Sequence, residues 1–209
     1  MTKIMKIRMM VTIGLAALLA SATQASQEQL AKSIHDVQLE TIKTSDQLKS
    51  TLMALNALSG QTKGDLRPAF EAFTAEVAKT EAAAVVTTAR VKWMDGDGQQ
   101  YFTDWQKTVD GINNESLRKK AQRRLDEAKA SYGKVQASLV KASDKFKPFL
   151  SDLADIQKAL SSDVTASGVK AIRGTVSTAN WDSKFVDQAV KTAIKEASKM
   201  EKALSTEAK

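Results

Sequence analysis

The stretch WMDGDGQQYFTDW, which begins at Trp93, is the part of this chain that most resembles a metal site. An EF-hand loop needs oxygen ligands at its first, third and fifth positions, glycine at the sixth and glutamate at the twelfth. A loop starting at Asp95 would have Gln100 and Gln106 at the sixth and twelfth positions. A loop starting at Trp93 would align Gly98 but lose its first ligand. The spacing argues against calcium, and we expect no metal.

The residue types needed for most other site chemistry are missing. His35 is the single histidine and the chain has no cysteine, so a zinc site cannot be assembled. It follows Ile34 of an apolar row by one position and should face solvent. There is no Gly-x-Ser-x-Gly motif and no glycine-rich phosphate loop. We therefore expect no catalytic residue, no cofactor and no enzymatic activity.

One short segment concentrates positive charge. Its cations are Arg118, Lys119, Lys120, Arg123 and Arg124. They are either a solvated helix face balanced by Asp126 and Glu127, or a binding surface for anionic lipid headgroups or cell-wall polymer. In the second case each cation near an anionic surface contributes ~1 kcal/mol. Because no aromatic residues alternate with the cations, nucleic acid is not an expected partner.

Helices must position these residues, because 9 Gly and 2 Pro in 209 residues are too few for the turns of an all-β fold. Apolar residues step alternately by four and three, as in a coiled-coil seam. The row that runs from Leu66 to Met94 continues in phase at Gly98, Tyr101 and Trp105. Two glycines cost a helix ~1 kcal/mol each, and each buried aromatic can offset ~1.5–3 kcal/mol. The DGDG segment is therefore predicted to be helical.

The first helix is expected to begin at a capping box formed by Ser26 and Gln29. It should end at the loop that contains Gly60 and Gly64. Its seam includes three threonines, which soften the helix contact, so it should depend on neighbouring helices. The seam residues are Leu30, Ile34, Val37, Thr41, Thr44, Leu48, Thr51, Leu55 and Leu58.

The second helix should have Asp65 as its N-cap and Pro68 in its first turn. The third should begin near Asn113 or Asn114, and Pro148 inside it should produce a kink. The apolar row of this helix is Leu117, Ala121, Leu125, Ala128, Tyr132, Val135, Leu139, Ala142, Phe146, Phe149, Leu153, Ile156 and Leu160.

The segment VKAIRGTVSTAN is expected to be a short helix or an irregular crossover, and the last helix should start near Trp181 or Asp182. Helices of about 45 residues are roughly 70 Å long, and short loops between them make neighbours antiparallel. The expected fold is all-α: an elongated antiparallel bundle, or coiled-coil hairpin of long helices, kinked near Pro148.

The first 25 residues have the layout of a secretory signal peptide, with three basic residues, an apolar run from Met9 to Ala20 and then small residues. Cleavage is expected after Ala25, alternatively after Ala22, which leaves residues 26–209 as a single bundle domain. The whole chain carries +7, and without the leader 28 basic and 24 acidic residues leave +4. We expect a periplasmic or secreted protein with no transmembrane segment in its mature form.

The second half resembles a known family through SLRKKAQRRLDEAKASYGKVQASLVKASDKFKPFLSDLADIQKAL, preceded by YFTDW. The shared elements are Leu117 with Arg118, Tyr132, Pro148 with Leu150, Asp155, and Ala171 with Ile172. They are similar to those of the bacterial exported proteins called domain of unknown function 2959, over roughly residues 33–204. The resemblance implies an envelope location, an all-helical fold and a helical DGDG segment, but no activity. The chain lacks the lipobox cysteine of many members, so the resemblance implies no lipid anchor here.

These patterns lead us to expect a non-enzymatic envelope protein that serves as a scaffold or protein-interaction module. Its partner would be another envelope protein or a second copy of the chain. The alternative is a peripheral binder of anionic lipid or cell-wall polymer through the cations from Arg118 to Arg124.

Overall fold

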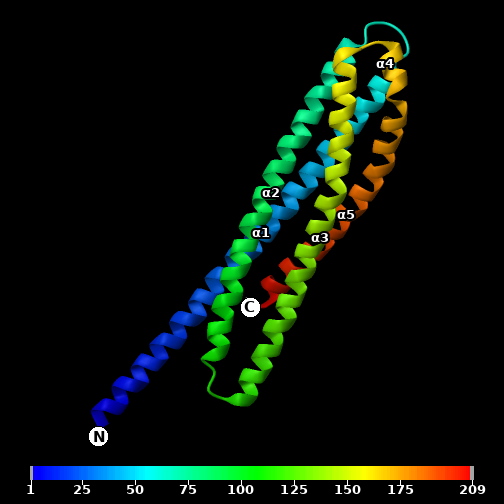
Figure 1. Ribbon diagram of the computed structural model, residues 1–209. Helices are drawn as coiled ribbons and strands as arrows, with labels where there is room; N and C mark the ends of the chain where they lie inside the picture. The colour runs from blue at the N-terminus through cyan, green and yellow to red at the C-terminus, as the bar shows by residue number, and fades with distance from the viewer. Residues whose placement is uncertain (1, 208–209) are drawn as a thin grey trace.

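Five helices make up the part of the chain that the structure describes. This computed structural model describes residues 2–207, and the side chains of residues 21–205. The helices are α1 (Thr2–Gly60), α2 (Arg67–Asp110), α3 (Glu115–Ser162), α4 (Ala166–Ala171) and α5 (Arg173–Glu207). In Figure 1 the four long helices run alternately up and down in an elongated bundle, and short α4 joins α3 to α5 at one end. The predicted all-α antiparallel bundle is confirmed.

The side chains on which the predicted signal peptide depends, from Lys3 to Ala20, lie outside the described side chains. In the remainder, none of the helices has an apolar stretch long enough to cross a bilayer.

The predicted seams form the core. All nine seam residues of α1, from Leu30 to Leu58, are buried, including its three threonines. Two clusters of apolar side chains fill the bundle. One, near α4, contains Leu55, Phe73 and Phe149, and the other, toward the α2–α3 turn, contains Ile34 and Met94. Burial of one apolar stripe along each sequence, kept in phase over many turns, explains why these segments form long helices.

Several predicted boundaries are confirmed. The side-chain oxygen of Asn114 accepts a hydrogen bond from the Leu117 N–H at 3.0 Å and caps α3. Pro68 lies in the first turn of α2. Gly64, in the loop after α1, has φ of +87°, a conformation that favours glycine. The helix α3 continues through Pro148, and the expected kink there stays a prediction.

Three predicted helix starts are wrong. Ser26 is not a cap, because α1 already runs through it and its hydroxyl donates to the Ala22 carbonyl at 3.0 Å. Leu66, not Asp65, is the N-cap of α2, although Asp65 still accepts from the Arg67 N–H at 3.0 Å. The last helix starts at Arg173, well before Trp181 or Asp182. Its apolar row extends backward through two further buried residues, Val176 and Ala179.

Leu117 belongs to the predicted apolar row of α3, but its side chain is 56 % exposed. The reason is the position along the bundle at which α5 ends. The Leu204 carbonyl accepts from Gln27 at 2.6 Å, and α5 ends one turn later, at Glu207. In Figure 1 the turn between α2 and α3 extends beyond this end. The first turns of α3 therefore lack α5 as a packing partner.

The DGDG segment lies inside α2, as predicted, and Gly98 explains its composition. A Cβ at Gly98 would lie 2.6 Å from the Tyr132 ring and hydroxyl of α3. The Tyr132 hydroxyl donates to the Met94 carbonyl at 2.9 Å, and its ring centroid lies 5.5 Å from that of Phe102. Burial, and then the negative charge of Asp95, raise the pKa of Tyr132, so the phenol stays a donor. Glycine lets an aromatic ring lie directly on the backbone of α2.

The two aspartates of the segment hold different neighbours. Asp95 accepts from Gln136 of α3 at 2.9 Å and from the Tyr132 hydroxyl at 3.3 Å. Asp97 accepts from the Ser33 hydroxyl of α1 and from Gln29 at 3.4 Å. The two carboxylates therefore point to different helices and join α2 to both α3 and α1.

The two glycines provide a matched pair of substitutions. Gly98→Ala should lower the free energy of unfolding by ~1–3 kcal/mol, because the new methyl group displaces the Tyr132 ring. A methyl group on Gly96 would meet no atom within 4 Å, so Gly96→Ala should raise stability by ~1 kcal/mol through helix propensity. Urea unfolding followed by circular dichroism measures both changes.

A double-mutant cycle supplies the control. In a Tyr132→Leu background, Gly98→Ala should lower the free energy of unfolding by less than it does in the natural chain, because the aromatic ring is gone. An equal loss of unfolding free energy in the two backgrounds would contradict the contact between Gly98 and Tyr132.

Candidate functional site

The predicted cationic cluster lies in the first three turns of α3, close to the turn between α2 and α3. All five of its side chains are exposed: Arg118, Lys119, Lys120, Arg123 and Arg124. Lys119 pairs with Glu115 at 2.7 Å, and both side chains are mostly exposed. Asp126, one of the two acids expected to balance the cluster, accepts a hydrogen bond from Gln122 at 2.9 Å. The structure thus places the cluster on an accessible end of the bundle.

This position is electrostatically unfavourable for cations. The partial positive charge of a helix N-terminus acts within the first turn, which here contains Arg118, and like charges four residues apart repel by ~0.2–0.5 kcal/mol. Lys119 and Arg123 form one such pair, and Lys120 and Arg124 form another. The pairing of Lys119 with Glu115 and the interaction that Arg124 makes offset part of this repulsion, and an anionic partner would relieve the rest.

His35 is exposed, as expected, and its Nδ1 lies 3.1 Å from Glu201 Oε1 of α5.

A polar hollow of about 390 Å³ lies between α1 and α2. Within it, Asp36 lies 2.9 Å from Lys32 and 3.6 Å from Arg90. The hydrogen bond from Lys32 lowers the pKa of Asp36. Across the described residues, no three His, Cys, Asp or Glu side chains gather as metal ligands.

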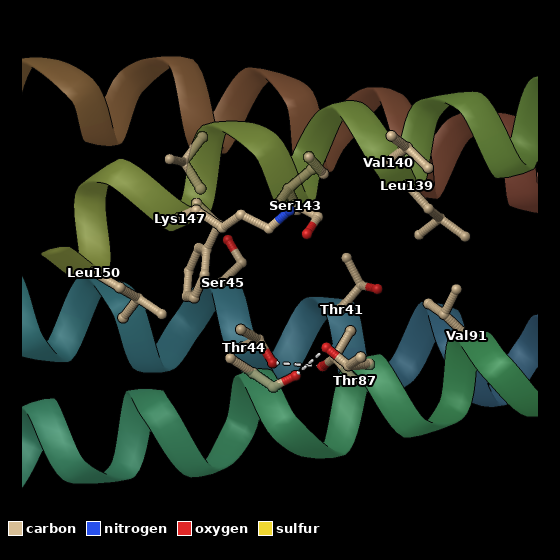
Figure 2. A pocket seen from close by; sticks show the side chains of 16 residues that line it. Thr41, Thr44, Ser45, Thr87, Val91, Leu139, Val140, Ser143, Lys147 and Leu150 are labelled. Carbon is tan, nitrogen blue, oxygen red and sulfur yellow. Dashed lines mark hydrogen bonds between the residues drawn. The ribbon is translucent and has the colours of Figure 1, made fainter.

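A second hollow, which the sequence analysis did not identify, lies halfway along the bundle. It is a groove of about 330 Å³, bounded by α1, α2, α3 and α5. Its apolar walls include Val91 of α2, Leu139 and Leu150 of α3, and Val190 of α5. Figure 2 shows α3 standing apart from the α1–α2 pair along this groove. Its volume is at the lower end of the ~300–1,000 Å³ typical of small-molecule pockets.

Small seam residues create this groove. Toward their ends the two seams bring large residues such as Leu30, Leu55, Phe73 and Met94 into the core. Between these, α1 brings Thr41 and Thr44, and α2 brings Ala84 and Thr87. The two core clusters lie on either side, with Val37 of α1 in one and Leu48 of α1 in the other. Side chains this short cannot reach across to α3, so a gap remains between α3 and the α1–α2 pair.

The hydroxyl groups in the groove differ in their hydrogen bonding. The hydroxyls of Thr44 and Thr87 lie 2.8 Å apart, and both also reach backbone carbonyls across the α1–α2 contact. Thr41 is only 5 % exposed, yet its Oγ1 finds no hydrogen-bond partner among the described residues. Most buried hydroxyls are paired, and leaving one unpaired costs ~1–3 kcal/mol. Figure 2 shows Thr41 projecting from α1 into the groove.

The sequence contains a usable signal for this groove. The α1 seam carries three threonines, and α2 carries an alanine and a threonine at the level of two of them. Comparing the small residues of the two antiparallel rows would have shown where the core is thin. Only the structure could show that the gap is left unfilled.

The family model described as "Protein of unknown function (DUF2959)" matches residues 20–204. The chain therefore belongs to this family. No curated protein and no solved structure matches the chain.

The unpaired hydroxyl generates a stability prediction. Thr41→Val keeps the shape of the side chain and removes the unpaired group, so it should raise the free energy of unfolding by ~1 kcal/mol. Thermal and urea unfolding measure the change.

Thr51→Val is the matched control on the same seam. It removes a hydroxyl that lies 2.7 Å from Thr80 Oγ1 and 3.0 Å from the Glu76 carbonyl, so it should lower stability by ~1–2 kcal/mol. Destabilisation of similar size in the two variants would contradict the difference between the two sites.

Proposed function

We propose that this chain is a non-enzymatic exported protein of the cell envelope, located in the periplasm or secreted, because its first 25 residues have the layout of a signal peptide and its sequence has no catalytic motif. Its long bundle would serve as a scaffold or protein-interaction module for another envelope protein or a second copy of itself. The observation that supports an interaction surface best is an exposed aromatic pair on α5.

Trp181 and Phe185 lie one turn apart, with their ring centroids 5.7 Å apart in an edge-to-face arrangement. Trp181 is 59 % exposed and Phe185 41 %, although the main apolar row of α5 is buried. Lys184 Nζ lies 5.1 Å from the Trp181 ring. Large aromatic side chains are enriched at the centres of protein interfaces, where they bury much surface in well-packed contacts. The pair is therefore a suitable anchor for a partner.

Site-specific photo-crosslinking in intact cells tests this proposal. A benzophenone side chain in place of Phe185 should give a discrete cross-linked band that mass spectrometry assigns to an envelope protein or to the chain itself. The same group in place of Lys191, exposed on the same helix, is the control. A yield at Phe185 no higher than at Lys191 would contradict the interaction surface.

The second candidate function is peripheral binding to anionic lipid or cell-wall polymer through the cationic cluster. The exposed position of all five cations in the first turns of α3 favours it. The repulsion between like charges four residues apart favours it as well, because an anionic partner would relieve this repulsion.

Sedimentation with anionic vesicles, and separately with peptidoglycan, over a salt series tests the second candidate. Binding should fall as salt rises, and Arg123→Glu with Arg124→Glu should weaken it at least ~tenfold. Lys141→Glu with Lys145→Glu, also exposed on α3, changes the net charge equally and should have a smaller effect. Equal losses in the two double variants would show that net charge alone causes the binding, and no binding at low salt would exclude this function.

A further inference from the structure

The groove between α3 and the α1–α2 pair combines features that neither proposed function uses. It is large enough for a small ligand, its walls are mostly apolar, and it holds a buried hydroxyl without a partner among the described residues. Loose packing alone would not require a polar group at this place. The question is which chemistry would occupy the groove.

Polar groups face each other across the middle of the groove. Ser45 follows Thr41 by one turn of α1, and Lys147 follows Ser143 by one turn of α3. Figure 2 shows Ser45 and Thr41 on the α1 side, with Ser143 and Lys147 opposite on α3. Residues four apart share a helix face, so both helices turn these groups to the same space.

Apolar groups lie on both sides of this polar zone. Val91, Leu139 and Val140 line the groove in one direction, and Leu150 in the other (Figure 2). Phe146 adds a further apolar side chain to the lining. Val140 is 60 % exposed, so the groove has an open apolar edge through which a ligand can enter. The lining thus offers a hydrogen-bonding zone beside a path for an extended apolar chain.

Lys147 sets the sign of the charge that the groove would accept. It is the single charged residue among the described residues that line the groove. Its ammonium also lies 3.3 Å from Asp144, but both side chains are largely exposed, and such pairs are weak. A carboxylate or phosphate in the groove could therefore compete for Lys147 and accept from the hydroxyls of Thr41 and Ser143.

We propose that this groove binds an anionic amphiphile with a single alkyl chain, its head group at Lys147, Ser143 and Thr41 and its chain along Val91, Leu139 and Val140. The unpaired Thr41 hydroxyl gains a hydrogen-bond acceptor when the ligand binds. The alkyl chain fills the space that the short seam residues leave open. This inference goes beyond the proposed scaffold function and does not depend on export or on the cationic cluster.

Isothermal titration calorimetry on the full, lipid-free chain tests the proposal, with ligands kept below their micellar concentrations. Laurate and 1-lauroyl-lysophosphatidylglycerol are the two anionic probes, and dodecyltrimethylammonium has a similar chain with a cationic head. At least one anionic probe should bind saturably at one site per chain, and the tighter of the two identifies a fatty acid or a lysolipid as the source. Absence of saturable binding by both anionic probes, or equally tight binding of the cationic probe, would overturn the proposal.

Variants then locate the site. Lys147→Gln should weaken binding of the anionic probe about tenfold, and Thr41→Val about fivefold. Lys145→Gln, exposed on the same helix but outside the groove, should bind as the natural chain does. Unchanged affinity in Lys147→Gln would place the ligand elsewhere and reject this assignment.

A variant that fills the groove gives a second test. Ala84→Leu places a larger side chain in the groove and should abolish binding. If Ala84→Leu fails to fold by circular dichroism, the comparison of Lys147→Gln with Lys145→Gln decides, since both lysines lie on the exposed surface of α3. Full binding by a folded Ala84→Leu would contradict the proposed path of the alkyl chain.

Discussion

The contact between the Tyr132 ring and the backbone of α2 at Gly98 is the constraint on which the half of this bundle nearer the α2–α3 turn depends. The ring can lie there only because Gly98 has no Cβ, and its hydroxyl is held by the Met94 carbonyl. The neighbouring Asp95 and Asp97 then join α2 to α3 and to α1. A segment whose composition resembles a metal loop is therefore an interhelical contact point, and α2 remains continuous across it.

Much of this architecture could be predicted from the sequence, because apolar periodicity reports directly which residues face a core. The α1 seam from Leu30 to Leu58 and the continuation of α2 through the glycines follow from spacing alone. The periodicity failed where the tertiary context decides. Ser26 resembles a cap only if the helix begins there, and Leu117 keeps the phase of α3 but lies beyond the end of α5. The early start of α5 was missed because the buried residues of its first turns are separated by polar residues that look like a loop.

The two candidate sites also differ in how far the sequence alone could predict them. The cationic cluster was visible in the sequence because charge is a property of composition, and the structure adds its exposed place in the first turns of α3. The groove was not visible, because a seam of Thr and Ala is compatible with close packing as well as with a gap. Whether short side chains bring two helices together or leave space between them depends on the larger residues in adjacent turns. Here larger side chains form a core cluster on either side, and the groove lies between the two clusters.

The central claim is that α2 is one uninterrupted helix through Gly96 and Gly98, locked by Tyr132. Hydrogen–deuterium exchange of the natural chain, resolved to peptides covering residues 93–105, tests it most directly. We expect these amides to exchange as slowly as those around Phe73 in the same helix, and far more slowly than those of the loop at residues 61–65. Exchange at the rate of that loop, or a slowing that appears only after calcium is added, would contradict it.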